Sequence, residues 1–153
     1  MFRPHGGLMS AAGRLDVERG RGPLAWLGAT LGGLPPAGRA TPVTLEVTMT
    51  PDGFLWKRTF AGKPLASALR ERDGDLVEEF GPLHLAFRLI DDGDVTEWRM
   101  TGMRLGPLRI PHFLALRVRV LTRLAGAGWH VDVRIAALLV GLLCRWHGFM
   151  EFR

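Results

Sequence analysis

Turn-forming residues divide most of the chain into short segments of similar length. Glycine, proline and aspartate favour turns because they supply the backbone conformations and local hydrogen bonds that turns need. Turn residues at such regular spacing indicate short strands joined by tight turns. The turns are Pro51-Asp52-Gly53, Asp73-Gly74, Gly81-Pro82, Asp91-Asp92-Gly93, Gly106-Pro107 and Gly126-Ala127-Gly128.

The segments between these turns alternate between apolar and polar residues. Residues 43–49 have valine, leucine or methionine at every second position, which is the period of a half-buried strand. The segment 54–60 follows directly across a turn, so the two predict a hairpin. In residues 83–89, Leu83, Leu85, Phe87 and Leu89 share one face. Further strands are expected at 65–72, 75–80, 83–90, 95–105, 114–123, 129–136 and 142–152.

One stretch, GPLAWLGATLGG, predicts a helix of about three turns. Pro23 suits the first helical turn, and Leu24, Leu27 and Leu31 repeat at helical spacing to form an apolar face. The preceding segment, AAGRLDVERG, predicts another strand with Leu15 and Val17 inward.

The fold class that follows is mainly β. We expect an antiparallel curved sheet, either barrel-like or a two-layer sandwich, with one short N-terminal helix. Such a sheet must close, fold onto itself, or use the helix to cover one apolar face. A chain of 153 residues fits a single domain over 1–153, with its core at about 13–152.

The composition argues against disorder and against a membrane-spanning helix. Hydrophobic residues make up 47% of the chain and charged residues 23%, and no apolar run reaches the length of a span. The most apolar stretch, 135–144, predicts a buried strand pair. No segment resembles a signal peptide, so a cytoplasmic location is expected. The single cysteine, Cys144, permits no internal disulfide.

The common catalytic patterns are missing. GRGPLA at 20–25 imitates a dinucleotide-binding turn, but Pro23 removes a backbone donor and a hairpin follows where a parallel strand should return. A simple anion site at this helix start, assisted by Arg19 or Arg21, stays open. Cys144 and His147 would lie on opposite faces of a strand. We therefore expect no metal and no cofactor, and binding rather than catalysis.

Two charged residues fall on apolar strand faces. Arg58 lies between Trp56 and Phe60, and Glu78 precedes Phe80 at the same alternation. If these faces point inward, the charges need each other or a ligand, because an isolated buried ion costs several kcal/mol. One alternative is a structural ion pair at a barrel end; the other is a site for a polar head group beside an apolar cavity, with Arg99, Arg104 or Arg145 nearby. The candidate ligand-binding residues are Trp56, Arg58, Phe60, Glu78, Phe80, Phe87, Arg104 and Trp146.

Positive charge is concentrated in the last third of the chain. Residues 104–153 contain eight basic and two acidic side chains, within a net charge of +5. Arg117, Arg119 and Arg123 share one face of a predicted strand and are candidates for contact with an anionic surface. A weak membrane contact ranks above nucleic acid, because no aromatic residue interleaves with these arginines for base stacking.

Motifs in consistent order resemble a known bacterial family. They are GRLDVERGRGPLAWLGATLGGLPPAGRATPVTLEV, WKRTFAGKPLAS, LVEEFGPLHLAFRL, MRLGPLRIP and GLLCRWHGF. Together they resemble domain of unknown function 4166, over about residues 13–149. The resemblance implies a protein that stands alone or is fused to a saccharopine-reductase-like or epimerase-like NAD-binding domain.

Three functional hypotheses follow. The first is a small binding domain that holds a lipophilic molecule between sheet and helix. The second is an accessory module for an NAD-dependent oxidoreductase partner, which predicts an exposed apolar patch. The third is an enzyme acting on a lipid-like substrate, for which Glu78 is the acid or base candidate.

Overall fold

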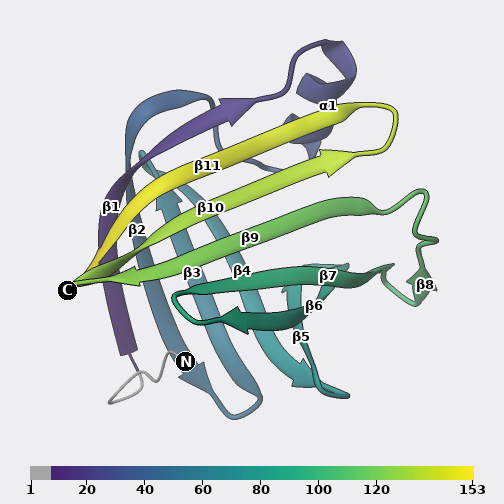
Figure 1. Ribbon diagram of the computed structural model, residues 1–153. Coiled ribbons are helices and arrows are strands. Elements are labelled where there is room, and N and C mark those ends of the chain that lie inside the picture. The colour runs from purple at the N-terminus through teal and green to yellow at the C-terminus, as the bar shows by residue number, and fades with distance from the viewer. Residues whose placement is uncertain (1–7) are drawn as a thin grey trace.

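The computed structural model describes residues 8–153 and forms one antiparallel β-barrel with a short helix beside it (Figure 1). The strand boundaries lie close to those expected from the turns, and each strand alternates between inward and outward side chains. The elements are β1 (Leu8–Arg19), α1 (Pro23–Leu31), β2 (Gly38–Thr50), β3 (Gly53–Phe60), β4 (Lys63–Arg72), β5 (Asp75–Phe80), β6 (Leu83–Asp92), β7 (Val95–Leu105), β8 (Leu108–Arg109), β9 (Leu116–Ala125), β10 (Gly128–Ala137) and β11 (Gly141–Phe152).

Ten strands close into a ring. Their order is β6-β5-β4-β3-β2-β1-β11-β10-β9-β7, and a β6–β7 pairing joins the two edges. The first and last strands pair with each other along most of their length, and β8 is a two-residue arm on β7. Every strand of the ring therefore has a neighbour on both sides, although β7 and β9 pair only through Val95–Arg99 and Arg119–Arg123, so the fold is a barrel and not a sandwich.

The barrel has two chemically different ends. One, called the helix end, comprises α1 and the connections 20–40, 61–62, 81–82, 106–115 and 138–140. The other, called the aspartate end, comprises the turns 51–52, 73–74, 93–94 and 126–127 with the strand residues beside them. In Figure 1 the helix end, with α1 and the β10–β11 turn, lies at the upper right.

The inward faces form the core. Val43, Leu45 and Val47 of β2 are buried as their alternation predicts, and Phe60 and Phe87 are among the largest fully buried side chains. The inward row of β6 ends earlier than expected: Leu83, Leu85 and Phe87 pack in the core, whereas Leu89 is 44% exposed near the aspartate end. Leu15 and Val17 of β1 are buried, as predicted.

The helix forms where it was expected but presents a different face. Ala25 and Ala29 are its buried residues, whereas Leu24, Leu27 and Leu31 are exposed. It packs outside the barrel, where a Cβ added to Gly28 would lie 3.3 Å from a methyl of Leu143 in β11. The prediction that the leucines form the buried face is wrong, because close packing of a helix on a flat strand favours small residues such as alanine. The helix contacts β11 and β1 and does not cover the concave face. Within residues 8–153, no helix has the length and hydrophobicity to cross a bilayer.

The segment after the helix covers one opening of the barrel. The carbonyl of Leu34 accepts hydrogen bonds from Arg19 Nη2 of β1 (2.6 Å) and from Lys63 Nζ of β4 (3.1 Å). Arg19 Nε also donates to the carbonyl of Pro35, at 2.9 Å. Because β2 and β3 lie between β1 and β4, the segment 32–37 crosses the helix end. Arg19 is thus occupied by backbone carbonyls and is not held at the helix start for an anion.

The apolar stretch 135–144 is a hairpin and not a wholly buried strand pair. Ile135, Leu143 and Cys144 are buried, but the turn between the strands places Leu138 and Leu139 on the surface. The expectation of burial is wrong at the turn because these side chains project beyond the barrel wall.

Candidate functional site

A polar network lies on the inner wall formed by β3, β4 and β5. Alternation turns Arg58 inward with Trp56 and Phe60, and turns Glu78 inward with Phe80. The middle strand supplies Ser67, which is buried. Three consecutive strands thereby place a cation, a hydroxyl and a carboxylate side by side.

The network meets at a single carboxylate oxygen. Arg58 Nη2 donates to Glu78 Oε1 at 2.8 Å, and the Ser67 hydroxyl donates to the same oxygen at 2.6 Å. Arg58 Nη1 also donates to Ser67 Oγ, at 3.2 Å. These hydrogen bonds compensate the unfavourable desolvation free energy of both charges. An isolated buried ion would have no such compensation. The structure pairs the two charges with each other, which is one of the two alternatives that the sequence left open.

Sequence reasoning missed Ser67 as a member of this network. Its signal was a serine in the inward series Leu65, Ser67 and Leu69, where an apolar residue is expected. A buried hydroxyl needs a hydrogen-bond partner. A serine at an inward position of this strand therefore indicated a polar neighbour.

An aromatic cluster borders the network. The guanidinium carbon of Arg58 lies 5.1 Å from the ring centre of Trp56, within cation–π range. Trp56 contacts Trp98 edge to face at 6.1 Å, and Trp98 contacts Phe87 at 5.9 Å. The Trp56 indole Nε1 is buried and has no hydrogen-bond acceptor among residues 8–153. An unsatisfied buried donor costs about 1–3 kcal/mol, so this N–H is unusual for a buried polar group.

The remaining candidates divide between the inside and the outside. Phe60 and Trp146 meet inside the barrel with ring centres 5.3 Å apart, and Phe80 packs partly buried against the same core. Arg104 is exposed and paired in register with His84 and Arg109, away from the network. The structure therefore places Arg104 outside the site to which sequence reasoning assigned it.

Comparison with protein families matches residues 1–150 to the family described as domain of unknown function (DUF4166). The chain belongs to the DUF4166 family. The resemblance seen in its motifs is therefore confirmed. Among solved structures it is similar to the crystal structure of Rv2717c from M. tuberculosis, with a TM-score of 0.49 and 18% identity, covering 94% of this chain and 91% of that one. Comparison with curated proteins gives no match.

Arg99 and Arg145 of this DUF4166 protein also face outward. Arg99 pairs with Glu97 at 3.4 Å. Arg145 binds Asp132 through two hydrogen bonds, Nε to Oδ1 at 3.0 Å and Nη2 to Oδ2 at 2.8 Å. The Arg145 guanidinium lowers the pKa of Asp132 through this hydrogen bond, and burial opposes the shift. Neither arginine reaches the inner network.

The arginine ladder of β9 belongs to a wider outer row. Arg117, Arg119 and Arg123 are exposed, and Arg119 pairs with Glu97 at 3.2 Å. Cross-strand register continues the row through adjacent strands, with the partners Arg88–Arg99, Arg99–Arg119, Arg119–Arg134 and Arg134–Arg145. Like charges directly opposite one another are unfavourable, and Glu97 and Asp132 offset part of that repulsion. Contact of the ladder with an anionic surface stays a prediction.

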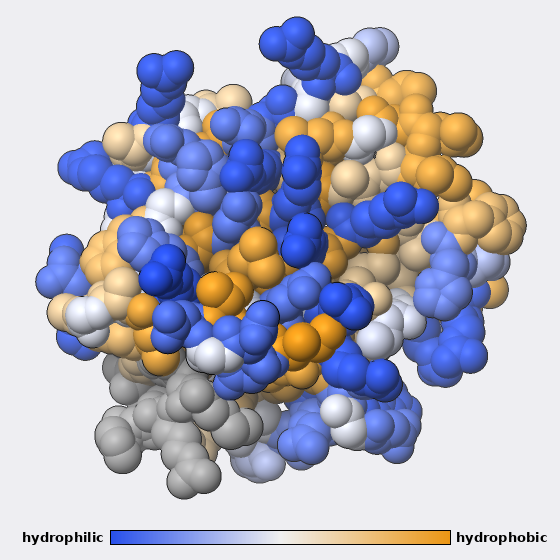
Figure 2. Space-filling view, in the orientation of Figure 1, coloured by the Kyte–Doolittle hydropathy of each residue, from blue (hydrophilic) through white to orange (hydrophobic). Residues whose placement is uncertain are grey.

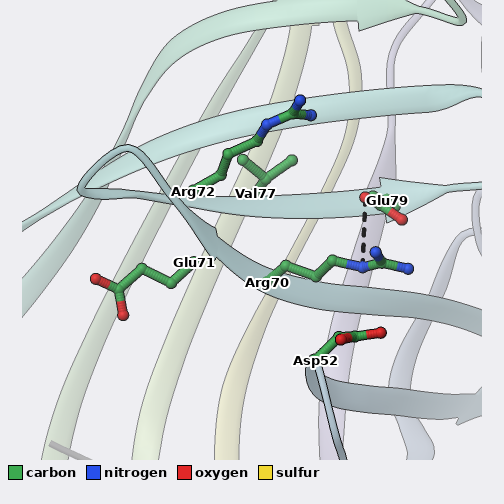
Figure 3. Close-up of a pocket in the computed structure, with 6 residues that line it drawn as sticks. All are labelled: Asp52, Arg70, Glu71, Arg72, Val77 and Glu79. Carbon is green, nitrogen blue, oxygen red and sulfur yellow. Dashed lines mark ion pairs between the residues drawn. The ribbon is translucent and has the colours of Figure 1, made fainter.

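Two shallow hollows lie on the outer wall. One, of about 420 Å³, is lined by Asp52, Arg70, Glu71, Arg72, Val77 and Glu79 (Figure 3). There Arg70 Nε lies 3.6 Å from Glu79 Oε1, so the charges compensate one another. The other, of about 500 Å³, lies over β1, β2 and β3 beside Pro42 and Thr59. Neither hollow includes a residue of the inner network.

Cys144 is inward and fully buried, with Sγ 4.0 Å from the carbonyl of Pro35. His147 lies on the outer face, 3.8 Å from Glu18. Within residues 8–153, no three His, Cys, Asp or Glu side chains converge as a metal site would require. Burial raises the pKa of the Cys144 thiol to about 11, so it is not poised as a nucleophile.

Proposed function

We propose that this DUF4166 protein binds a lipophilic small molecule inside its barrel. The observation that carries the proposal is the buried Trp56 N–H without an acceptor, adjacent to the Arg58 guanidinium. Both groups are hydrogen-bond donors, and apart from Ser67 and Glu78 the inward residues around them are apolar. The ligand they suit has a carboxylate or carbonyl group on an apolar body.

The accessibility of the network supports this role. The side chains of Arg58 and Glu78 are largely buried but keep 15% and 9% of their surface exposed, so the network borders open space at its edge. The flanking inward residues Phe54, Trp56 and Trp98 are only partly buried. The opposite part of the interior, around Phe60 and Trp146, is closely packed. A ten-stranded ring also encloses more space than an eight-stranded one, which already holds a small ligand in some families.

Glu78 has a binding role in this proposal and not a catalytic one. Its Oε1 accepts two hydrogen bonds that fix the carboxylate against β4. We therefore place the carboxylate as the group that orients Arg58 toward the ligand.

The experiment begins with native mass spectrometry of the purified protein and analysis of its organic extract. A fatty acid and the methyl ester of the same acid are then titrated while intrinsic tryptophan fluorescence is recorded. We expect the acid to bind more tightly, and Arg58→Met to weaken it by roughly tenfold or more, as loss of a charge-assisted hydrogen bond would.

Arg104→Met is the matched control, because Arg104 lies outside the barrel and should leave the Kd unchanged. If Arg58→Met lowers stability but not affinity, the inner network is structural only. If the wild-type protein carries no lipophilic mass and takes up neither probe, the proposal is wrong.

A further inference from the structure

Exposed apolar side chains are concentrated at the helix end of the barrel. Of the fourteen large apolar residues exposed in the described chain, ten lie there, counting the last residue of β7. In Figure 2 apolar surface gathers at the upper right, where Figure 1 shows α1 and the β10–β11 turn. The ten residues are Leu24, Trp26, Leu27, Leu31, Leu105, Leu108, Phe113, Leu114, Leu138 and Leu139.

Folding alone does not account for this surface. The helix packs on the barrel through its alanines, which leaves Trp26 and three leucines exposed to solvent. Leu139 is 99% exposed and has a φ of 71°, in the left-handed region. That conformation is unfavourable for a residue with a branched side chain, and glycine or asparagine would tolerate it better. Leu139 is thus held outward at a position where nothing within the described chain covers it.

The charges are arranged along the same axis. The helix-end segments 20–40, 61–62, 81–82, 106–115 and 138–140 contain no aspartate or glutamate. They contain Arg21, Arg39 and Arg109, which have no ion-pair partner among residues 8–153. The opposite end has aspartates in or beside its turns, at Asp52, Asp73, Asp75, Asp91, Asp92 and Asp94. One end is therefore apolar and cationic, and the other is anionic.

From these observations we infer that the helix end docks on an anionic lipid bilayer. Projecting leucines and aromatics enter the headgroup boundary, and the arginines around them contact lipid phosphates. Each arginine near such a surface adds to the attraction, and the aspartate end is repelled from it, which orients the barrel. The docking surface uses no residue of the inner network, so it stands independently of the proposed ligand site.

The test is flotation with large unilamellar vesicles. Vesicles of phosphatidylcholine with phosphatidylglycerol are compared with vesicles of phosphatidylcholine alone, at low and at high salt. We expect the wild-type protein to float with the anionic vesicles and to be released by salt. In anionic vesicles containing brominated lipid, we expect quenching of Trp26 fluorescence, identified by its loss in Trp26→Phe.

Matched variants place the contact. Leu139→Glu should weaken vesicle binding by about tenfold or more, because it removes an inserted side chain and adds a repelled charge. Leu124→Glu makes the same change at a 68% exposed residue beside the aspartate end and should leave binding unchanged. Arg109→Glu at the helix end should also weaken vesicle binding. Its control, Arg72→Glu at the aspartate end, should leave binding unchanged.

Three outcomes would overturn the inference. The first is equal binding, or none, to the two vesicle types. The second is that Arg117→Glu or Arg134→Glu removes binding while Arg109→Glu does not, which would place the contact on the outer arginine row. The third is that light scattering detects a dimer that Leu139→Glu dissociates, without vesicle binding by the wild type. The surface would then be an interface between copies of the chain.

Discussion

Arg58 Nη2 lies 2.8 Å from Glu78 Oε1 on the inner wall of the barrel, and this pair is the most buried of the ion pairs in the described chain. The pair spans two strands that are not neighbours, because β4 lies between β3 and β5. Ser67 of β4 fills the gap by donating to the same oxygen. The three side chains therefore tie one wall together and set the polarity of the interior.

Breaking this pair on one side should destabilise the protein by about 3 kcal/mol, because the remaining charge is left in the barrel without a partner. The change is Glu78→Gln, and the measurement is the free energy of unfolding from urea denaturation. The double variant Arg58→Met with Glu78→Met should lose less than the sum of the single losses, because it leaves neither charge alone.

The outer pair of Arg70 and Glu79 is the control. Its atoms are 3.6 Å apart and its side chains are 49% and 21% exposed, so Glu79→Gln should change stability by less than about 1 kcal/mol. If Glu78→Gln and Glu79→Gln have the same small effect, the inner pair is solvated and the interior is open to water.

Cys144 should be unreactive in the folded protein. The thiol is buried beneath Pro35 and its pKa is raised to about 11, so both access and thiolate formation are suppressed at pH 8. Labelling with a chromogenic disulfide should be slow in native buffer and should reach one thiol per chain in denaturant.

Cys144 labelling also reports on the covering segment. Arg19→Ala removes the Arg19 donors to the carbonyls of Leu34 and Pro35, leaves only Lys63 donating to the Leu34 carbonyl, and should speed labelling. Fast labelling of the wild-type protein at pH 8 would contradict this account, because it would mean that the segment 32–37 opens readily.

The contact between α1 and the barrel wall requires small side chains on the helix. Ala29 is fully buried, so Ala29→Leu should destabilise the protein by about 1–3 kcal/mol through overpacking. Leu24→Ala, on the exposed face, should change stability by less than about 0.5 kcal/mol. Urea denaturation of both variants measures the difference. The reverse ranking would mean that the leucine face packs on the barrel in solution.

Local structure could be predicted from the sequence because its causes are local. The turn residues and the alternation in 43–60 depend on neighbours along the chain. Closure could not be predicted, because it rests on β1 pairing with β11 and on β7 pairing with β9 across the segment 106–115. No pattern within one strand specifies such distant partners.

The same limit applies to the site and to the helix. Two charges on inward faces predicted either an ion pair or a bound head group. Ser67 and the Trp56 N–H, which has no partner in the described chain, emerge only when the strands are placed together. The leucine repeat of the helix indicated a buried face, since periodicity marks apolar positions without saying what covers them. Here the alanines are covered and the leucines are not.

The ion pair of Asp132 and Arg145 should make the free energy of unfolding depend on pH in acidic solution. Because the folded pKa of Asp132 is lowered below 3.8, its contribution is present above that value and is lost as the pH falls through the folded pKa. Asp132→Asn should therefore cost at most about 1 kcal/mol at pH 7, and the difference from wild type should shrink below pH 3.8. Urea denaturation at pH 7 and at pH 3 measures both quantities, with Asp52→Asn, in an exposed turn, as the control. A difference that persists unchanged at the lower pH would show that the carboxylate charge does not contribute, and that the two hydrogen bonds from Arg145 act equally on a neutral amide.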